Sequence, residues 1–300
     1  MKTTPDTPAK PLRKTHIRPR RIAGVVLALA GIFLLSFTVY GRFKDLRDPA
    51  VHGLDPATPH GVVLTYAEFL EDLPRRAGEG AGDYAVRLNT LVNRGMAHSW
   101  GPEGSGSGNM VLPPWENWLI WLDSLDQEDR RYEFGDPFRA MKRGIGLCSQ
   151  HAMALYGFLV RAGIQARIVD LTGHVVVRAE TAPGKWWILD PDIGVAIPHD
   201  MDEIERAPSL VVPFYTGQVA EESLEALVRL YGREGNCIWD YDIPRTWRDR
   251  LFNRDAWKYN EEARRYVLIW LIPLLMFAAG MFLLRTPRKR KPETQDTPLT

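Results

Sequence analysis

The chain carries almost no net charge and very little cysteine. Its 38 lysines and arginines are balanced by 37 aspartates and glutamates, which leaves a formal charge of +1 over 300 residues. This balance gives no electrostatic argument for a nucleic-acid partner. The sequence has no internal repeat and only two cysteines. One of them, Cys148, follows two glycines and a leucine in GIGLCSQHA (144–152) and precedes a helix-like run, so its position needs an explanation.

Charged residues are absent from two long apolar stretches, residues 22–40 and 266–284. A helix of either length spans roughly 28 Å at ~1.5 Å per residue, close to the ~30 Å hydrocarbon core of a bilayer. Neither stretch has the polar face of a helix in a soluble protein. We therefore predict two transmembrane helices, with Pro273 able to kink the second. The first stretch is longer than a signal-peptide core, and no small-x-small cleavage site follows it, so an uncleaved anchor is expected.

Basic residues around the first stretch set the expected orientation. Residues 2–21 contain seven lysines and arginines, whereas residues 41–60 contain three. By the positive-inside rule, both termini are cytoplasmic and the central region faces the outside or the periplasm, an oxidising compartment. The predicted organisation is a basic cytoplasmic tail (1–21), a first span (22–40), an extracytoplasmic domain (41–265, core about 84–217), a second span (266–284) and a basic cytoplasmic tail (285–300).

Upstream of Cys148, helical patterns alternate with a turn-like stretch. Two helices are predicted within residues 61–97 from apolar residues at helical spacing, namely Tyr66, Phe69, Leu70 and Leu73, then Tyr84, Leu88, Leu91 and Val92. GPEGSGSGN (101–109) favours a mobile loop, which we expect to form a flap near the site. PPWENWLIWL (113–122) spaces three tryptophans at intervals of three, as in a helix of the core wall or one whose aromatic face meets substrate.

The segment from residue 144 to residue 192 predicts a helix followed by three strands. SQHAMALYGFLVRAG reads as a helix with an apolar face, ended by Gly163. Residues 165–171, 174–180 and 186–191 alternate in polarity or are rich in β-branched residues, and short turns join them. Short turns imply antiparallel strands. The expected fold class is therefore α+β, with a cysteine-bearing helix packed on an antiparallel sheet.

This arrangement brings three reactive residue types together. Cys148 falls at the helix start, where exposed N–H groups and the helix dipole favour an anion such as the reactive thiolate. His174 opens the second strand and Asp190 closes the third, and such positions are neighbours in an antiparallel pair. A thiol, a base and a carboxylate that orients the base are the components of nucleophilic catalysis.

Each of the three residues also has an ordinary interpretation. A lone cysteine usually fills core space, a histidine at a strand end is often a surface residue, and Asp before Pro commonly begins a turn. Cys148, His151 and His174 could instead bind zinc, although no second cysteine or HExxH-type pair accompanies them. A disulfide between Cys148 and Cys237 is a further alternative in an oxidising compartment.

Three blocks of the sequence resemble a known family. RGIGLCSQHAMAL (143–155), GHVVV (173–177) and WWILDPDIG (186–194) are similar, in this order and spacing, to the transglutaminase-like superfamily, here as a membrane-anchored bacterial-type member. The resemblance spans about 50 residues, with a weaker likeness running back through YEFGDPFRAMKRG (132–144).

The resemblance implies a papain-like core in which Cys148 is the nucleophile, His174 the general base and acid, and Asp190 the orienting carboxylate. It implies a thiol enzyme that attacks an amide or peptide-type carbonyl through a Cys148 acyl-enzyme and passes the acyl group to water or to an amine. No metal or organic cofactor is expected. The expected partners are the lipid bilayer and a protein, peptide or envelope polymer as substrate. Because the family has members without activity, a non-catalytic envelope binding or scaffold module is the alternative.

Overall fold

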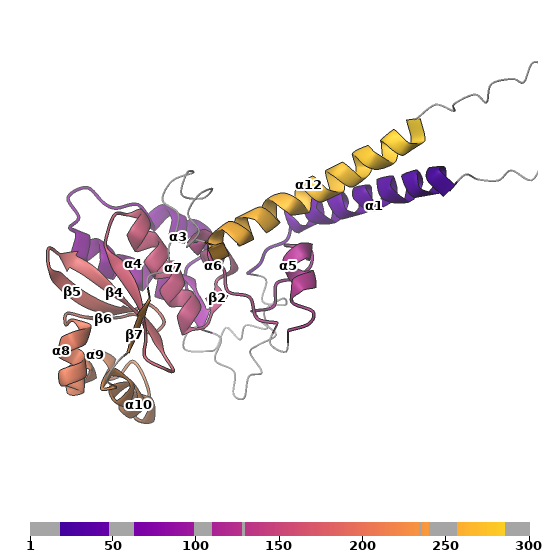
Figure 1. Ribbon diagram of the computed structural model, residues 1–300. Coiled ribbons are helices and arrows are strands. Elements are labelled where there is room, and N and C mark those ends of the chain that lie inside the picture. Colours follow the sequence, from indigo (N-terminus) through magenta and orange to yellow (C-terminus); the bar gives the residue numbers. More distant parts are fainter. Residues whose placement is uncertain are drawn as a thin grey trace, which may run out of the picture. The chain divides into compact units, whose positions relative to one another are not determined.

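The computed structural model describes residues 19–47, 63–98, 110–127, 130–233, 236–239 and 257–285, with backbone alone for 239 and 257–259. These residues fall into two compact units, one of the two chain ends and one of the central region (Figure 1). The first unit contains the chain up to Val39 and from Leu268 onwards, and the second contains Tyr40–Val267.

Most of α1 (Pro19–Gly41) and the C-terminal part of α12 (Trp257–Arg285) pack together in the first unit. By length and composition, α1 and residues Asn260–Arg285 of α12 are long and apolar enough to cross a membrane. Glycine allows the close contact between them. A Cβ on Gly31 would lie 2.6 Å from the Pro273 carbonyl oxygen, and one on Gly280 would lie 2.6 Å from the Gly24 carbonyl oxygen. Backbones can approach this closely only where side chains are absent.

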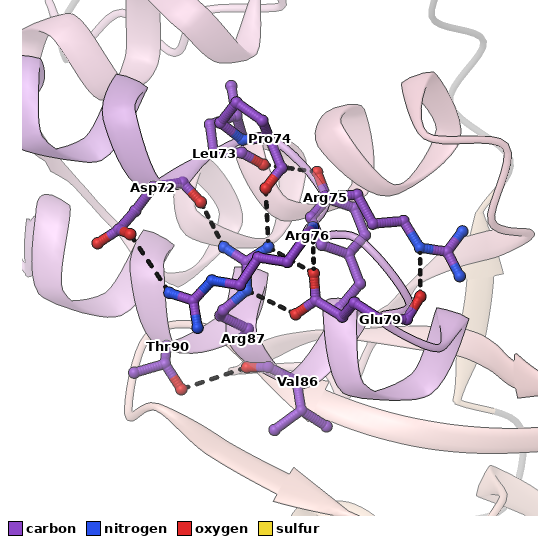
Figure 2. A network of polar contacts seen from close by, with 10 residues as sticks. Asp72, Leu73, Pro74, Arg75, Arg76, Glu79, Val86, Arg87 and Thr90 are labelled. Carbon is purple, nitrogen blue, oxygen red and sulfur yellow. Dashed lines mark hydrogen bonds and ion pairs between the residues drawn. The ribbon is translucent and has the colours of Figure 1, made fainter.

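The second unit begins with two of the predicted helices, α3 (Tyr66–Asp72) and α4 (Ala81–Gly95). Thr65 and Glu68 form a reciprocal capping box at the start of α3. Arg87 of α4 holds the connection between the two helices (Figure 2). It binds the Glu79 carboxylate through both Nε (2.6 Å) and Nη2 (2.7 Å), and Nη2 also donates to the Pro74 carbonyl oxygen. The hydrogen bonds from Arg87 hold the pKa of Glu79 at about 2.

A five-stranded antiparallel sheet forms the centre of this unit, in the order β6-β5-β4-β3-β7. Its strands are β3 (Ala166–Asp170), β4 (Val175–Ala182), β5 (Lys185–Asp190), β6 (Val195–Ile197) and β7 (Cys237–Trp239). The three strands predicted from the sequence are therefore present and antiparallel. The short edge strands β6 and β7 were not predicted.

Apolar residues alternate between the two faces of the sheet and build two cores. Val177 and Leu189 point to one face, where α4 and α7 (Cys148–Arg161) pack, and Val176 and Ile188 point to the other. The second face is covered by α8 (Met201–Arg206), η2 (Pro208–Val211), α9 (Val212–Tyr215) and α10 (Glu221–Tyr231). Helix α7 is buried on nearly all sides, more than the single apolar face expected from its sequence.

The elements between α4 and α7 are short. They are β1 (Ala97–His98), α5 (Trp118–Asp123), α6 (Pro137–Arg143) and β2 (Ile145–Gly146), and β1 pairs in parallel with β2. The predicted tryptophan-rich helix over 113–122 is wrong in extent, because Asn117 caps α5 by accepting a hydrogen bond from the Ile120 N–H. Trp115 consequently precedes the helix, and Ile120 is its fully buried residue.

Candidate functional site

A sharp turn between α6 and α7 places Cys148. Gly144 ends α6 in the left-handed conformation (φ 70°), and its N–H bonds to the Ala140 carbonyl oxygen. The chain then runs through β2 to Leu147, which precedes the first helical residue, Cys148, without a side-chain cap. Gly146 allows the turn to lie against the helix, because a Cβ there would be 2.6 Å from the Cβ of Gln150. The cysteine therefore sits at a helix start whose N–H groups have no side-chain acceptor from the cap position.

Two hairpins of the sheet place the other two predicted residues. A turn through Thr172 (φ 58°) and Gly173 (φ 142°) joins β3 to β4, and the Leu171 N–H bonds to the His174 carbonyl oxygen at 2.8 Å. Strand β5 then runs antiparallel to β4, with Val177 opposite Leu189. This register leaves His174, just before β4, and Asp190, the last residue of β5, as diagonal neighbours on one face.

The structure brings Cys148, His174 and Asp190 together in series. His174 Nε2 lies 2.7 Å from Asp190 Oδ2, and Cys148 lies close enough to His174 to raise the pKa of its ring. Burial favours the neutral ring, but Asp190 and then Cys148 more than offset it, so the pKa of His174 is raised well above its usual value.

Asp190 is held by more than the histidine. Its Oδ2 also accepts a hydrogen bond from the Tyr215 hydroxyl at 2.7 Å, and its Oδ1 accepts from the N–H groups of Asp192 (3.0 Å) and Ile193 (3.1 Å). Tyr215 in turn contacts the Tyr231 hydroxyl at 2.8 Å. Burial, with Asp190 next, raises the pKa of Tyr215 well above its usual value, so the hydroxyl remains a donor to the carboxylate.

Sequence reasoning missed both tyrosines. Tyr215 ends the four-residue helix α9, and Tyr231 ends α10. Neither lies in a motif. Tyr215 reaches Asp190, and Tyr231 reaches Tyr215, only because the C-terminal helices fold across the second face of the sheet. Buried tyrosines usually find a hydrogen-bond partner, but the sequence does not say which one.

A fully buried arginine supports the turn before Cys148. Arg143 donates from Nε to the Ile145 carbonyl oxygen at 3.0 Å, from Nη1 to the Tyr132 carbonyl oxygen, and from Nη2 to Gln150 Oε1 at 3.0 Å. Gln150 also binds the backbone of Phe134 in both directions. Burial lowers the pKa of Arg143 to about 10, which leaves it charged near neutral pH.

A second polar cluster lies beside these residues. His98, His151 and Asp192 each offer one potential ligand atom, and these atoms lie within 4.8 Å of one another. Burial lowers the pKa of His98, with Asp192 acting in the opposite direction. The zinc site considered from the sequence combined His151 with Cys148 and His174. Among the described residues, the cluster instead combines His151 with His98 and Asp192.

The remaining sequence-based alternatives have different outcomes. Both cysteines carry free thiols, so the Cys148–Cys237 disulfide is not formed. Cys237 is exposed on β7, where it pairs with Asp170. The predicted flap, residues 101–109, lies outside the described residues.

The arrangement can perform proton transfer next to a nucleophile. A thiol lies beside a buried imidazole, and a carboxylate holds that ring at Nε2. The raised pKa of His174 favours its protonated form, which can donate a proton next to the thiol.

Comparison with protein-family models, with curated proteins and with solved structures found no match to this chain.

Proposed function

We propose that this chain is a membrane-anchored thiol enzyme that attacks an amide or peptide-type carbonyl through Cys148. The observation that carries the proposal is the position of Cys148 beside His174, whose ring is hydrogen-bonded to Asp190. The resemblance of residues 143–155, 173–177 and 186–194 to the transglutaminase-like superfamily agrees with it.

In the first half-reaction the Cys148 sulfur bonds to the carbonyl carbon, and the C–N bond of the amide breaks. The amine leaves with a proton supplied by the His174 imidazolium, a state that the raised pKa of this ring makes available. Asp190 keeps the ring oriented from Nε2, and Tyr215 keeps Asp190 in place. The backbone N–H of Cys148, at a helix start without a side-chain cap, is the donor that we assign to the developing oxyanion.

In the second half-reaction water or an amine attacks the thioester. His174, now neutral, takes a proton from the incoming group, the acyl–sulfur bond breaks, and the thiolate and imidazolium are restored. The proposed setting is the outer or periplasmic side of the inner membrane, with both termini in the cytoplasm. The two long apolar helices support membrane anchoring, and the charges of the flanking residues support this orientation. The proposed substrate is a protein, peptide or envelope polymer.

The proposal is tested by the reactivity of the two thiols, for which no substrate is needed. The purified full-length protein is treated with iodoacetamide near neutral pH, and the alkylation of each cysteine is followed by mass spectrometry. Cys148, although half-buried, should react faster than the exposed Cys237. His174→Ala should remove most of this advantage and leave the rate at Cys237 unchanged, so Cys237 is the internal control.

Function is tested separately in a deletion strain. Cys148→Ala and His174→Ala should give folded, membrane-inserted protein that no longer complements, whereas Cys237→Ala should complement fully. A Cys148→Ala protein that complements fully would contradict the enzyme proposal and support the non-catalytic binding module in its place.

A further inference from the structure

Three buried side chains from distant parts of the chain converge next to the proposed thiol site. His98 ends β1, His151 lies in the first turns of α7, and Asp192 lies in the turn after β5. Their side chains are 5%, 0% and 1% exposed. His98 Nδ1 contacts Asp192 Oδ1, and His151 Nδ1 lies 3.6 Å from the same oxygen. Two imidazole nitrogens therefore face one carboxylate.

The ring of His151 is surrounded by oxygen atoms. Its Nε2 lies 3.0 Å from the Met96 carbonyl oxygen, and its Nδ1 lies 2.9 Å from the Leu147 carbonyl oxygen. A neutral imidazole carries one hydrogen. If Nε2 donates that hydrogen to Met96, the Nδ1 lone pair faces the oxygens of both Leu147 and Asp192. In this tautomer the Nδ1 lone pair is available to a metal ion bound between His151 and Asp192.

Asp192 provides an independent observation. Its Oδ2 is buried and has no hydrogen-bond partner within the described part of the chain. Leaving an oxygen of a buried carboxylate unpaired is costly. A metal ion bound by the carboxylate and by the two Nδ1 atoms uses all of these groups. Donation from His151 Nε2 to a backbone carbonyl is also the usual way in which a metal-binding histidine is oriented.

We propose that His98, His151 and Asp192 bind one divalent transition-metal ion of the zinc class. Two imidazole nitrogens and a carboxylate oxygen are a common zinc ligand set, whereas Ca²⁺ and Mg²⁺ prefer oxygen ligands. The site goes beyond the proposed thiol chemistry, because none of its three ligands belongs to the Cys148–His174–Asp190 series.

Such an ion would fix the elements that carry the thiol site. His98 pairs with Gly146, two positions before Cys148, and Asp192 donates its N–H to Asp190. The Asp192 carbonyl is held in turn by Asn93 of α4, at 2.7 Å. One ion would thereby join β1, the start of α7 and the turn after β5, and its binding should weaken as pH falls because protons compete for the same ligand atoms.

The experiment measures zinc in the full-length protein after chelator treatment, reloading with Zn²⁺ and gel filtration in detergent. Cys148→Ala/Cys237→Ala is used as the background, so that thiols cannot account for bound metal. We expect about one zinc per chain and a higher melting temperature with zinc than without. His98→Ala and the nearly isosteric Asp192→Asn should reduce the zinc content to background. His174→Ala, a buried histidine with its own aspartate, and His199→Ala, at the surface, should retain it.

A second measurement tests the proposal even if the ligand variants fail to fold. The cysteine-containing protein is loaded with Co²⁺, and its absorption spectrum should show the visible bands of nitrogen and oxygen ligation without a thiolate-to-cobalt charge-transfer band. A charge-transfer band that disappears in Cys148→Ala would assign the metal to the thiol and overturn the proposal. Absence of bound zinc and cobalt would overturn it as well.

Discussion

Asp190 is the side chain on which most of the site depends. It receives four hydrogen bonds, from His174, from Tyr215 and from two backbone N–H groups, and it is fully buried. Asp190 is also the main reason why the pKa of the neighbouring His174 is raised against the effect of burial.

Asp190→Asn should therefore lower the pKa of His174. The folded-state pKa of this histidine is raised, so its protonation stabilises the folded protein fully below the usual histidine value of about 6.5, and this contribution is lost as pH rises through the folded pKa. In the variant the loss should move to lower pH. Histidine NMR titration of the full-length protein in detergent micelles measures the shift, with the exposed His199 as internal reference. An unchanged His174 pKa would contradict the assigned role of Asp190.

The site residues differ in how far they could be predicted from the sequence. Cys148 begins a helix, and His174 and Asp190 lie at or next to strand ends. The order of these elements and the short turns between them determine which residues are neighbours. Tyr215 and His98 reach the same region through contacts distant in sequence, and no local pattern encodes such contacts. The structure shows that the three predicted residues are neighbours, whereas the chemistry assigned to them stays a prediction.

Among secondary-structure elements, strand β2 packs closely against the first turns of α7. A Cβ on Gly146, the last residue of β2, would approach the Gln150 side chain to 2.6 Å and the Met96 sulfur to 3.0 Å. Gln150 is tied to Phe134 and Arg143 and has little freedom to move away. A larger residue at this position must displace the helix start or the strand.

Gly146→Ala should lower the free energy of unfolding by about 1–3 kcal/mol, the usual cost of overpacking, and should slow the alkylation of Cys148. Chemical unfolding and iodoacetamide kinetics measure the two effects. Gly80→Ala is the matched control, because its Cβ would meet only the end of the Asp83 side chain, at 3.2 Å. Equal alkylation rates in Gly146→Ala and wild type would show that this close packing does not position the thiol.

The elements themselves were predictable where periodicity was strong. Helices α3 and α4 and strands β3 to β5 follow from apolar spacing and turn signals. Strand β7 is only three residues long and pairs with β3 from far along the chain, so nothing local marks it. The prediction for the tryptophan-rich stretch was wrong in extent, because its three-residue spacing suggested a longer helix than the Asn117 cap permits.

For the chain as a whole, the orientation across the membrane is the prediction with the widest consequences. Seven basic residues in 2–21 against three in 41–60 place the N-terminus in the cytoplasm, and two spans return the C-terminus there. A reporter fused after residue 300 should be active only in the cytoplasm, and one inserted within 101–109 only outside. The reverse pattern would place the proposed site in the cytoplasm and would contradict the extracytoplasmic substrate.

The buried Arg143 has a consequence for how the site assembles during folding. Its guanidinium donates to oxygens of Met110, Tyr132, Ile145 and Gln150, and no carboxylate is among its hydrogen-bond partners in the described chain. An unpaired buried charge is very costly. A partly folded state in which only one of these segments contacts Arg143 therefore gains little stability. Residues 132–150 should therefore unfold and refold locally as one cooperative unit. The Cys148 thiol is then either held by all of its neighbours or not positioned at all.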